Sequence, residues 1–132
     1  MQMRAQADIA IALDVCHAPQ PGADSLDVSP LDKPALLRSP VVHPKLFERA
    51  KQVAKDHNIP YTVEVSGARS HTDADNLQIA RGGIPTMLLS LPLRYMHTTV
   101  ELFDRAAFMH CARWLAHLLA SLDDRWEEWL CY

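Results

Sequence analysis

Short apolar runs alternate along this chain with segments whose apolar residues are three or four positions apart. Residues 8–15 and 84–91 form runs of strand length that are apolar on both faces, as is typical of strands in a parallel sheet covered by helices. Residues 61–65 alternate apolar and polar side chains, which predicts a third strand. Residues 36–42 predict a fourth, and the arginine and proline within it favour a position at the sheet edge.

The helical segments follow a different spacing. Residues 43–58 predict an amphipathic helix that opens on a His-Pro pair, because proline suits the first helical position. Residues 74–81 predict a shorter helix, and 103–122 predict the longest, with Asp104 as its N-cap. The predicted apolar face of the longest helix consists of Ala107, Phe108, Cys111, Trp114, Leu115, Leu118 and Leu122.

Together these segments predict the fold class. The order strand, edge strand, helix, strand, helix, strand, helix indicates an α/β fold, with a mostly parallel central sheet flanked by helices. The length of 132 residues suits one hydrophobic core, so we expect a single α/β domain over residues 1–132.

Composition excludes several function classes. The formal net charge of −3 argues against a nucleic-acid surface, which needs a basic stripe. No apolar run approaches the roughly 20 residues of a membrane span, and residues 1–6 lack the apolar core of a secretory signal. Three cysteines without a framework spacing indicate reduced thiols. We therefore expect a cytoplasmic protein that binds neither nucleic acid nor membranes.

Candidate functional residues lie where the first and last strands end. Asp14 ends the first apolar run, and Arg94 and His97 follow the last one. Ligands of open α/β sheets bind at the carboxyl ends of strands, and an imidazole there can serve a metal ion or transfer a proton. For Asp14 the residue pattern leaves a second interpretation open, in which the carboxylate caps the next turn.

Two other groups carry open alternatives. Thr72 and Asp73 precede the helix at 74–81, where either side chain could serve as its cap or face a ligand. Cys16 and His17 are adjacent, but a structural zinc site needs four ligands in recognisable pairs, and no second pair is present.

Four short motifs carry a resemblance to a known family. They are Ala-Leu-Asp-Val-Cys-His-Ala at 12–18, Thr-Asp-Ala at 72–74, Gly-Ile-Pro-Thr at 83–86 and Arg-Tyr-Met-His at 94–97. In this order and spacing they resemble the end of the tetrahedral or glutamyl aminopeptidases, which are cytosolic metallopeptidases with two metal ions. The resemblance covers about residues 8–122 and corresponds to the C-terminal part of that family's catalytic domain.

The resemblance implies a function and a set of roles. The family removes N-terminal residues from peptides with a water activated by two divalent metal ions, zinc or cobalt. Asp14 and His97 take the places of ligands to different metals, and His71 departs from the small residue usual before Thr-Asp-Ala. We expect Asp73 to receive the peptide's ammonium group, and Arg94 to orient a carbonyl or an acidic side chain.

The resemblance also implies that the site is incomplete. The family's first histidine, its bridging aspartate and its adjacent glutamate pair, which includes the general base, all lie upstream of the portion matched. We therefore expect no general base in this segment; Glu127-Glu128 is an adjacent pair, but it lies in the C-terminal tail.

Two functions of different class follow. In the first, the chain is part of a metalloaminopeptidase that acts on peptides, and it forms a homo-oligomer or binds a partner that supplies the missing half. In the second, it is a non-catalytic α/β module for binding or assembly. In either case we expect the aromatic tail at 126–132 to be an exposed patch that seeks a partner.

Overall fold

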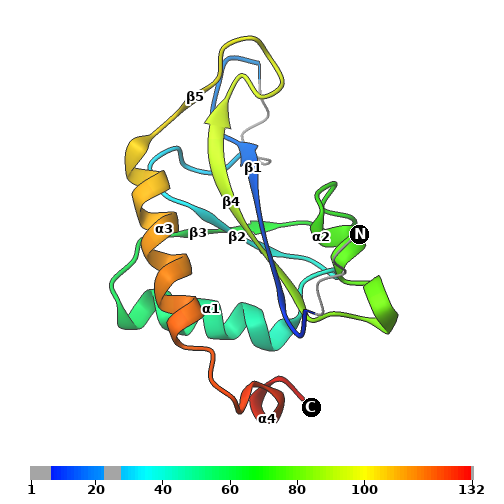
Figure 1. The fold of residues 1–132 in the computed structure, drawn as a ribbon. Helices are drawn as coiled ribbons and strands as arrows, with labels where there is room; N and C mark the ends of the chain where they lie inside the picture. Colours follow the sequence, from blue (N-terminus) through cyan, green and yellow to red (C-terminus); the bar gives the residue numbers. More distant parts are fainter. Residues whose placement is uncertain (1–6, 23–27, 132) are drawn as a thin grey trace, which may run out of the picture.

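The computed structural model describes residues 7–22 and 28–131. Its centre is a five-stranded sheet with the order β1-β4-β2-β3, in which β5 also pairs with β4 (Figure 1). The strands are β1 (Ala10–His17), β2 (Ala35–Arg38), β3 (Thr62–Val65), β4 (Thr86–Arg94) and β5 (Leu102–Phe103). The helices are α1 (Pro44–Asp56), α2 (Ala74–Leu77), the 3₁₀ turn η1 (Ala80–Gly82), α3 (Arg105–Ala120) and α4 (Trp126–Leu130).

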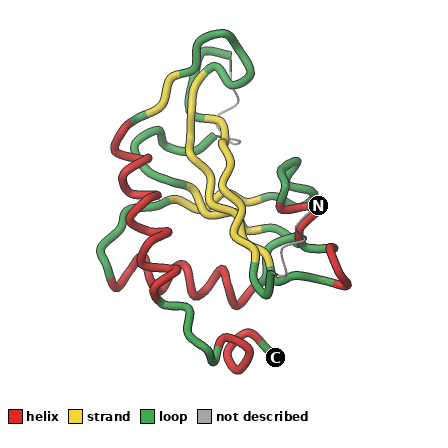
Figure 2. Tube along the Cα trace, viewed as in Figure 1, coloured by secondary structure: helices red, strands yellow, loops and turns green. Residues whose placement is uncertain are grey.

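Strand pairing in this sheet is mixed but mostly parallel. β1 and β4 run parallel over eight residue pairs, from Ala10 opposite Thr86 to His17 opposite Leu93. β2 and β3 are parallel over four pairs, whereas the antiparallel contacts of β4 with β2 and with β5 join two pairs each. Figure 2 shows the strands crossing the middle of the molecule with helices around them. The predicted α/β class with a mostly parallel sheet is confirmed.

The sheet position predicted for residues 36–42 is wrong. β2 lies between β4 and β3, and its first three residues are almost completely buried. The strand ends at Arg38, before Pro40, so neither residue interrupts its ladder. The Arg38 guanidinium turns back over the ring of Phe47, 4.9 Å from its centroid. The edge is occupied by β3, where Val63 and Val65 are exposed.

β4 is longer than its apolar run predicts, because it continues through Pro92 to Arg94. The carbonyl of Pro85 accepts a hydrogen bond from Ala10 of β1, and the carbonyl of Leu93 accepts one from Ala18, the residue after β1. The backbone N–H and C=O groups of odd-numbered residues in β4 therefore face β1. The backbone of Pro92 faces the other side. There it falls between the residues paired with β2 and those paired with β5, where a missing N–H breaks no ladder.

The core is centred on the contact between α1 and α3. Trp114 of α3 is fully buried, and its indole N–H donates a 2.9 Å hydrogen bond to the backbone carbonyl of Ala50 in α1. Asp104 caps α3 as predicted, since its carboxylate accepts from the N–H of Ala106 at 2.7 Å. The predicted apolar face is wrong at Phe108, which is 51% exposed.

The segment predicted as one helix at 74–81 forms two short pieces instead. α2 ends at Leu77, and η1 follows, with Arg81 in the left-handed region at φ 54°. A left-handed residue cannot continue a right-handed helix, so the chain turns here toward β4.

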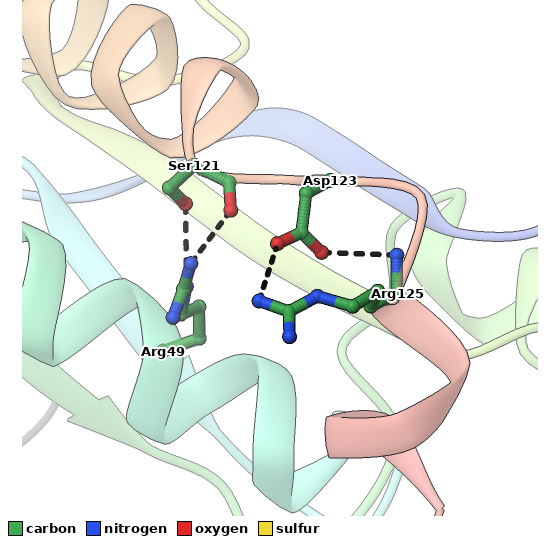
Figure 3. A network of polar contacts seen from close by, with 4 residues as sticks. All are labelled: Arg49, Ser121, Asp123 and Arg125. Atoms are coloured by element: carbon green, nitrogen blue, oxygen red, sulfur yellow. Dashed lines mark hydrogen bonds and ion pairs between the residues drawn. The ribbon is translucent and has the colours of Figure 1, made fainter.

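The aromatic tail folds back instead of standing exposed, so that expectation is wrong for its described part. Leu130 of α4 is buried, and Trp126 and Trp129 pack against the core. The Arg49 guanidinium of α1 donates to the backbone carbonyl of Ser121 at 2.6 Å (Figure 3). It also lies 5.3 Å from the Trp129 ring centroid. No helix in the described part of the chain is long and apolar enough to cross a membrane.

Candidate functional site

A polar cavity of about 420 Å³ lies beside β1. Its lining residues are Asp14, Arg69, His71, Thr72, Asp73, Asp75 and Asn76. The fold thus brings Asp14 and Asp73, predicted from separate motifs, to one cavity. His71, which is adjacent to the Thr-Asp-Ala motif, lines it as well.

Asp75 shapes the wall of this cavity. Its carboxylate accepts hydrogen bonds from the Ser70 N–H at 2.8 Å, the Ser70 hydroxyl at 2.7 Å and the His71 N–H at 2.9 Å. Partial burial acts to raise the pKa of Asp75, but these hydrogen bonds and the nearby His71 outweigh it, so the pKa is lowered. His71 is held with φ at 58°, a backbone conformation that is uncommon for residues other than glycine and clusters at functional sites.

Of the two residues that could cap α2, Thr72 does so and Asp73 does not. The Thr72 hydroxyl accepts from the N–H of Ala74 at 3.2 Å and so satisfies the start of α2. Asp73 occupies the N-cap position, but its side chain makes no capping hydrogen bond. Among the described residues its exposed carboxylate has neither a hydrogen bond nor an ion pair, so it is available to a cationic ligand.

The prediction that Asp14 lies at the end of the first strand is wrong. Asp14 lies inside β1, opposite Ser90 of β4. The strand continues to His17 because β4 continues as its partner to Leu93. One carboxylate oxygen of Asp14 accepts from the neighbouring Val15 N–H at 2.8 Å, and the side chain is half-buried. This bond joins adjacent residues within the strand, so Asp14 does not cap a following turn, which was the alternative interpretation.

His97 lies in the loop between β4 and β5, which projects beyond the sheet (Figure 2). Tyr95 and His97 both have left-handed backbones, with φ at 61° and 63°. The His97 N–H donates to the Glu101 carboxylate at 2.8 Å, and the Tyr95 N–H donates to the side-chain oxygen of Gln20 at 2.6 Å. These bonds fix the loop backbone and leave the His97 imidazole exposed.

Arg94 is the last residue of β4 and is half-buried. Its Nε is buried and has no hydrogen-bond partner within the described residues. Arg94 also forms no ion pair with any residue that the structure describes. A buried guanidinium nitrogen without a partner is uncommon, so this atom is open to an acceptor from outside the chain.

Asp14 and His97, the metal ligands implied by the resemblance, lie on different elements, Asp14 within β1 and His97 in the loop after β4. In residues 7–22 and 28–131, no three His, Cys, Asp or Glu side chains form a group that could hold a metal ion. A catalytic zinc site uses three protein ligands, so the described residues alone do not fit a complete metal centre.

Asp75 is a residue of the cavity wall that the sequence motifs did not indicate. An acidic residue in the first turn of a predicted helix is a recognisable signal, because it favours the positive end of the helix dipole. That signal places Asp75 at the start of the helix. It does not predict that the preceding loop folds around the Asp75 carboxylate, which depends on the hydrogen bonds donated by Ser70 and His71.

Cys16 lies on β1 in a buried environment. Burial raises the pKa of its thiol to about 12, and the negative charge of Glu64 raises it further. A hydrogen bond with Ser29 acts in the opposite direction and lowers the pKa. Burial also raises the pKa of Glu64 itself, and His17 partly opposes that shift. No three His, Cys, Asp or Glu side chains of residues 7–22 and 28–131 form a group that could hold a metal ion, so Cys16 and His17 lack co-ligands there for a structural zinc site.

These environments predict the reactivity of the three free cysteines. Cys16 and Cys111 are buried and Cys131 is exposed, and burial raises the pKa of Cys111 as well. At pH 8 a thiol with a pKa near 12 is thiolate roughly a thousandfold less often than an ordinary cysteine. We expect Ellman's reagent to modify one thiol quickly in the native protein and three in denaturant. A Cys131→Ser variant should lose the fast phase; a fast phase that persists would contradict the assigned environments.

Comparison with known proteins identifies the family. The model of the M42 glutamyl aminopeptidase family matches residues 1–114. A lysyl aminopeptidase of Pyrococcus furiosus is 44% identical over 98 residues, which cover 74% of this chain and 28% of that protein. This chain also superposes on the crystal structure of a TET aminopeptidase from the marine sediment archaeon Thaumarchaeota archaeon SCGC AB-539-E09, with a TM-score of 0.83. The two chains are 26% identical, and the superposition covers 93% of this chain and 36% of that chain.

A more distant structure shares the fold. PhTET1-12s, described as a dodecamer in the asymmetric unit, superposes with a TM-score of 0.65 at 20% identity, over 87% of this chain and 34% of that chain. This chain therefore spans about a third of the length of these proteins, and the match to the lysyl aminopeptidase falls in its C-terminal portion. The chain belongs to the M42 glutamyl aminopeptidase family.

Proposed function

We propose that these 132 residues are the C-terminal part of an aminopeptidase catalytic domain and form the substrate side of its site. The observation that carries the proposal is the cavity at which Asp14 of β1 meets Asp73 and His71. The exposed Asp73 carboxylate, without a partner among the described residues, would bind the ammonium group of a peptide's N-terminus. The buried Arg94 Nε would donate to an oxygen of the substrate.

The assignment of Asp14 and His97 as ligands to two divalent metals, zinc or cobalt, belongs to this proposal. It rests on their positions in the matched motifs and on the exposure of the His97 imidazole. The remaining ligands and the general base would come from the rest of the domain, on the same or a second polypeptide. We further propose that the assembled protein is a homo-oligomer, since a structure with this fold is described as a dodecamer, and that it works in the cytoplasm, where its free cysteines stay reduced.

One observation favours a second candidate function. Because no three metal-binding side chains of the described residues converge, the chain by itself has the features of a non-catalytic binding or assembly module that retained the family's fold. Catalysis in the assembled domain would distinguish the two functions.

A chimera provides that test. In it, this chain replaces the segment of the Pyrococcus furiosus lysyl aminopeptidase that it matches. We expect the chimera to hydrolyse aminoacyl anilides only with added zinc, cobalt or manganese. The 132-residue chain alone should be inactive, because a missing general base by itself removes about 10² to 10⁴ in rate.

Two results would contradict the proposal. Metal-dependent turnover by the chain alone would mean that its own residues, or those of several copies, complete the site. A folded, assembled chimera without turnover would favour the binding module. Circular dichroism and sedimentation of the chimera establish that it is folded and assembled before it is assayed.

A further inference from the structure

The loop between β4 and β5 holds two residues in an uncommon backbone conformation. Tyr95 and His97 both lie in the left-handed region, with φ at 61° and 63°. The Thr98 N–H donates to the Tyr95 carbonyl at 3.1 Å, so residues 95–98 form a turn whose third residue is His97. Glycine is the usual residue at a left-handed third position of a turn, and a residue with a Cβ atom is strained there. The loop therefore carries its imidazole at a position where the backbone alone favours glycine.

A side-chain acceptor binds the N–H of each left-handed residue. The Glu101 carboxylate accepts from the His97 N–H at 2.8 Å, and the Gln20 side-chain oxygen accepts from the Tyr95 N–H at 2.6 Å. The bond to Glu101 is charge-assisted, and such bonds are stronger than those between neutral groups. Glu101 forms no ion pair with any residue in the described part of the chain.

The two acceptors approach the loop from different segments. Gln20 lies three residues after β1, in a segment that is bound to β4 through the hydrogen bond from the Ala18 N–H to the Leu93 carbonyl (Figure 1). Glu101 directly precedes β5. The loop is thus tied on one side to the strand that carries Asp14 and on the other side to its own return strand. The place of His97 relative to Asp14 depends on both ties.

We infer that Glu101 and Gln20 are positioning residues, which hold the His97 imidazole at a fixed place relative to Asp14. This inference rests on the proposed function, in which Asp14 and His97 serve the same reaction. Each acceptor acts through a backbone N–H of the loop and has no need to touch the substrate. Loss of either acceptor should therefore lower kcat and leave KM unchanged. A loop that served only to connect β4 with β5 would need neither acceptor, because glycine adopts the left-handed conformation without strain.

The first measurement uses the 132-residue chain alone and follows hydrogen exchange of single backbone N–H groups by NMR. We expect Glu101→Ala to speed exchange at His97 at least about tenfold, since a hydrogen bond to a charged group is lost. Glu101→Gln keeps an acceptor oxygen and should change this rate less than about threefold. Gln20→Ala should speed exchange at Tyr95. The matched control is Glu48→Ala, which removes an exposed carboxylate paired with Lys51 and should alter neither rate.

The second measurement places the same variants in the chimeric aminopeptidase. Glu101→Ala should lower kcat about tenfold or more with KM within about twofold, as loss of an outer partner of a catalytic histidine does. Gln20→Ala should have a smaller effect in the same direction, because its acceptor is uncharged. Glu101→Gln should keep most of the turnover, and Glu48→Ala all of it. Circular dichroism checks that each variant is folded, and Gln20→Ala tests the second tie independently of the first.

Each outcome supports or overturns the inference. Unchanged exchange at His97 in the Glu101→Ala chain would overturn it, and so would faster exchange with an unaltered kcat. A loss of turnover in Glu101→Gln as large as in Glu101→Ala would overturn it as well, because the charge and not the hydrogen bond would then matter. A chimera without turnover contradicts the proposed function, while faster exchange in the Glu101→Ala and Gln20→Ala chains would still support the two ties. An active chimera in which neither variant alters exchange or kcat would do the reverse.

Discussion

His97→Ala should lower kcat/KM more than about 100-fold in the chimeric aminopeptidase, since even an outer partner of a metal ligand is worth roughly 10- to 100-fold. We expect the same effect from Asp14→Ala. If the two residues serve different metals, each variant loses one metal ion per chain and keeps the other. Elemental analysis of the purified variants measures this directly, alongside turnover of aminoacyl anilides.

Matched variants separate this effect from general damage. His57→Ala removes an exposed imidazole at the C-terminal end of α1, where it stacks on His117 of α3, and it should leave turnover and metal content unchanged. Asp73→Asn should raise KM with little change in kcat, because it removes a charge that binds the substrate's ammonium group. Full metal content in both the Asp14 and His97 variants would show that neither residue is a ligand.

The strands that form the site were predictable because their patterns are local. β1 and β4 are apolar on successive residues, and such runs identify buried parallel strands without knowledge of their partners. Their ends were not predictable in the same way. Asp14 lies inside β1 because β4 continues past Pro92, and a strand extends as far as its neighbour pairs with it.

Sheet order depends on contacts between distant segments. Arg38 and Pro40 correctly mark the end of β2, but end residues do not determine which strands flank it. The alternation in β3 likewise predicts a strand without predicting its orientation. Glu64 is half-buried and its neighbouring valines are exposed, because β3 lies at the edge.

The sequence predicted which residues lie near the site, but not how their side chains and backbones are arranged there. The motifs correctly indicated that Asp73 lies in a loop beside the sheet. The left-handed backbone of His71 and the hydrogen bonds that Ser70 donates to Asp75 arise only when the loop closes on α2. That the family's remaining metal ligands lie outside the matched portion stays a prediction, because it rests on the resemblance alone.

Trp114→Ala should lower the free energy of unfolding by about 3–5 kcal/mol, out of a total of roughly 5–15 kcal/mol for a domain of this size. The indole is fully buried between α1 and the sheet, 4.8 Å from the Tyr61 ring, so its removal leaves a large cavity. It also removes the hydrogen bond that the indole N–H donates to the Ala50 carbonyl. Trp114→Phe keeps most of the volume and should lose about 0.5–1.5 kcal/mol from the missing hydrogen bond.

Urea unfolding followed by circular dichroism measures both variants. Phe108→Ala is the control, because Phe108 is an aromatic residue on the same helix, is half exposed, and should change stability by only about 0.5 kcal/mol. A Trp114→Ala protein as stable as the Phe108 variant would mean that α3 does not pack on α1 through this residue. A Phe108 variant as unstable as Trp114→Ala would place Phe108 in the core.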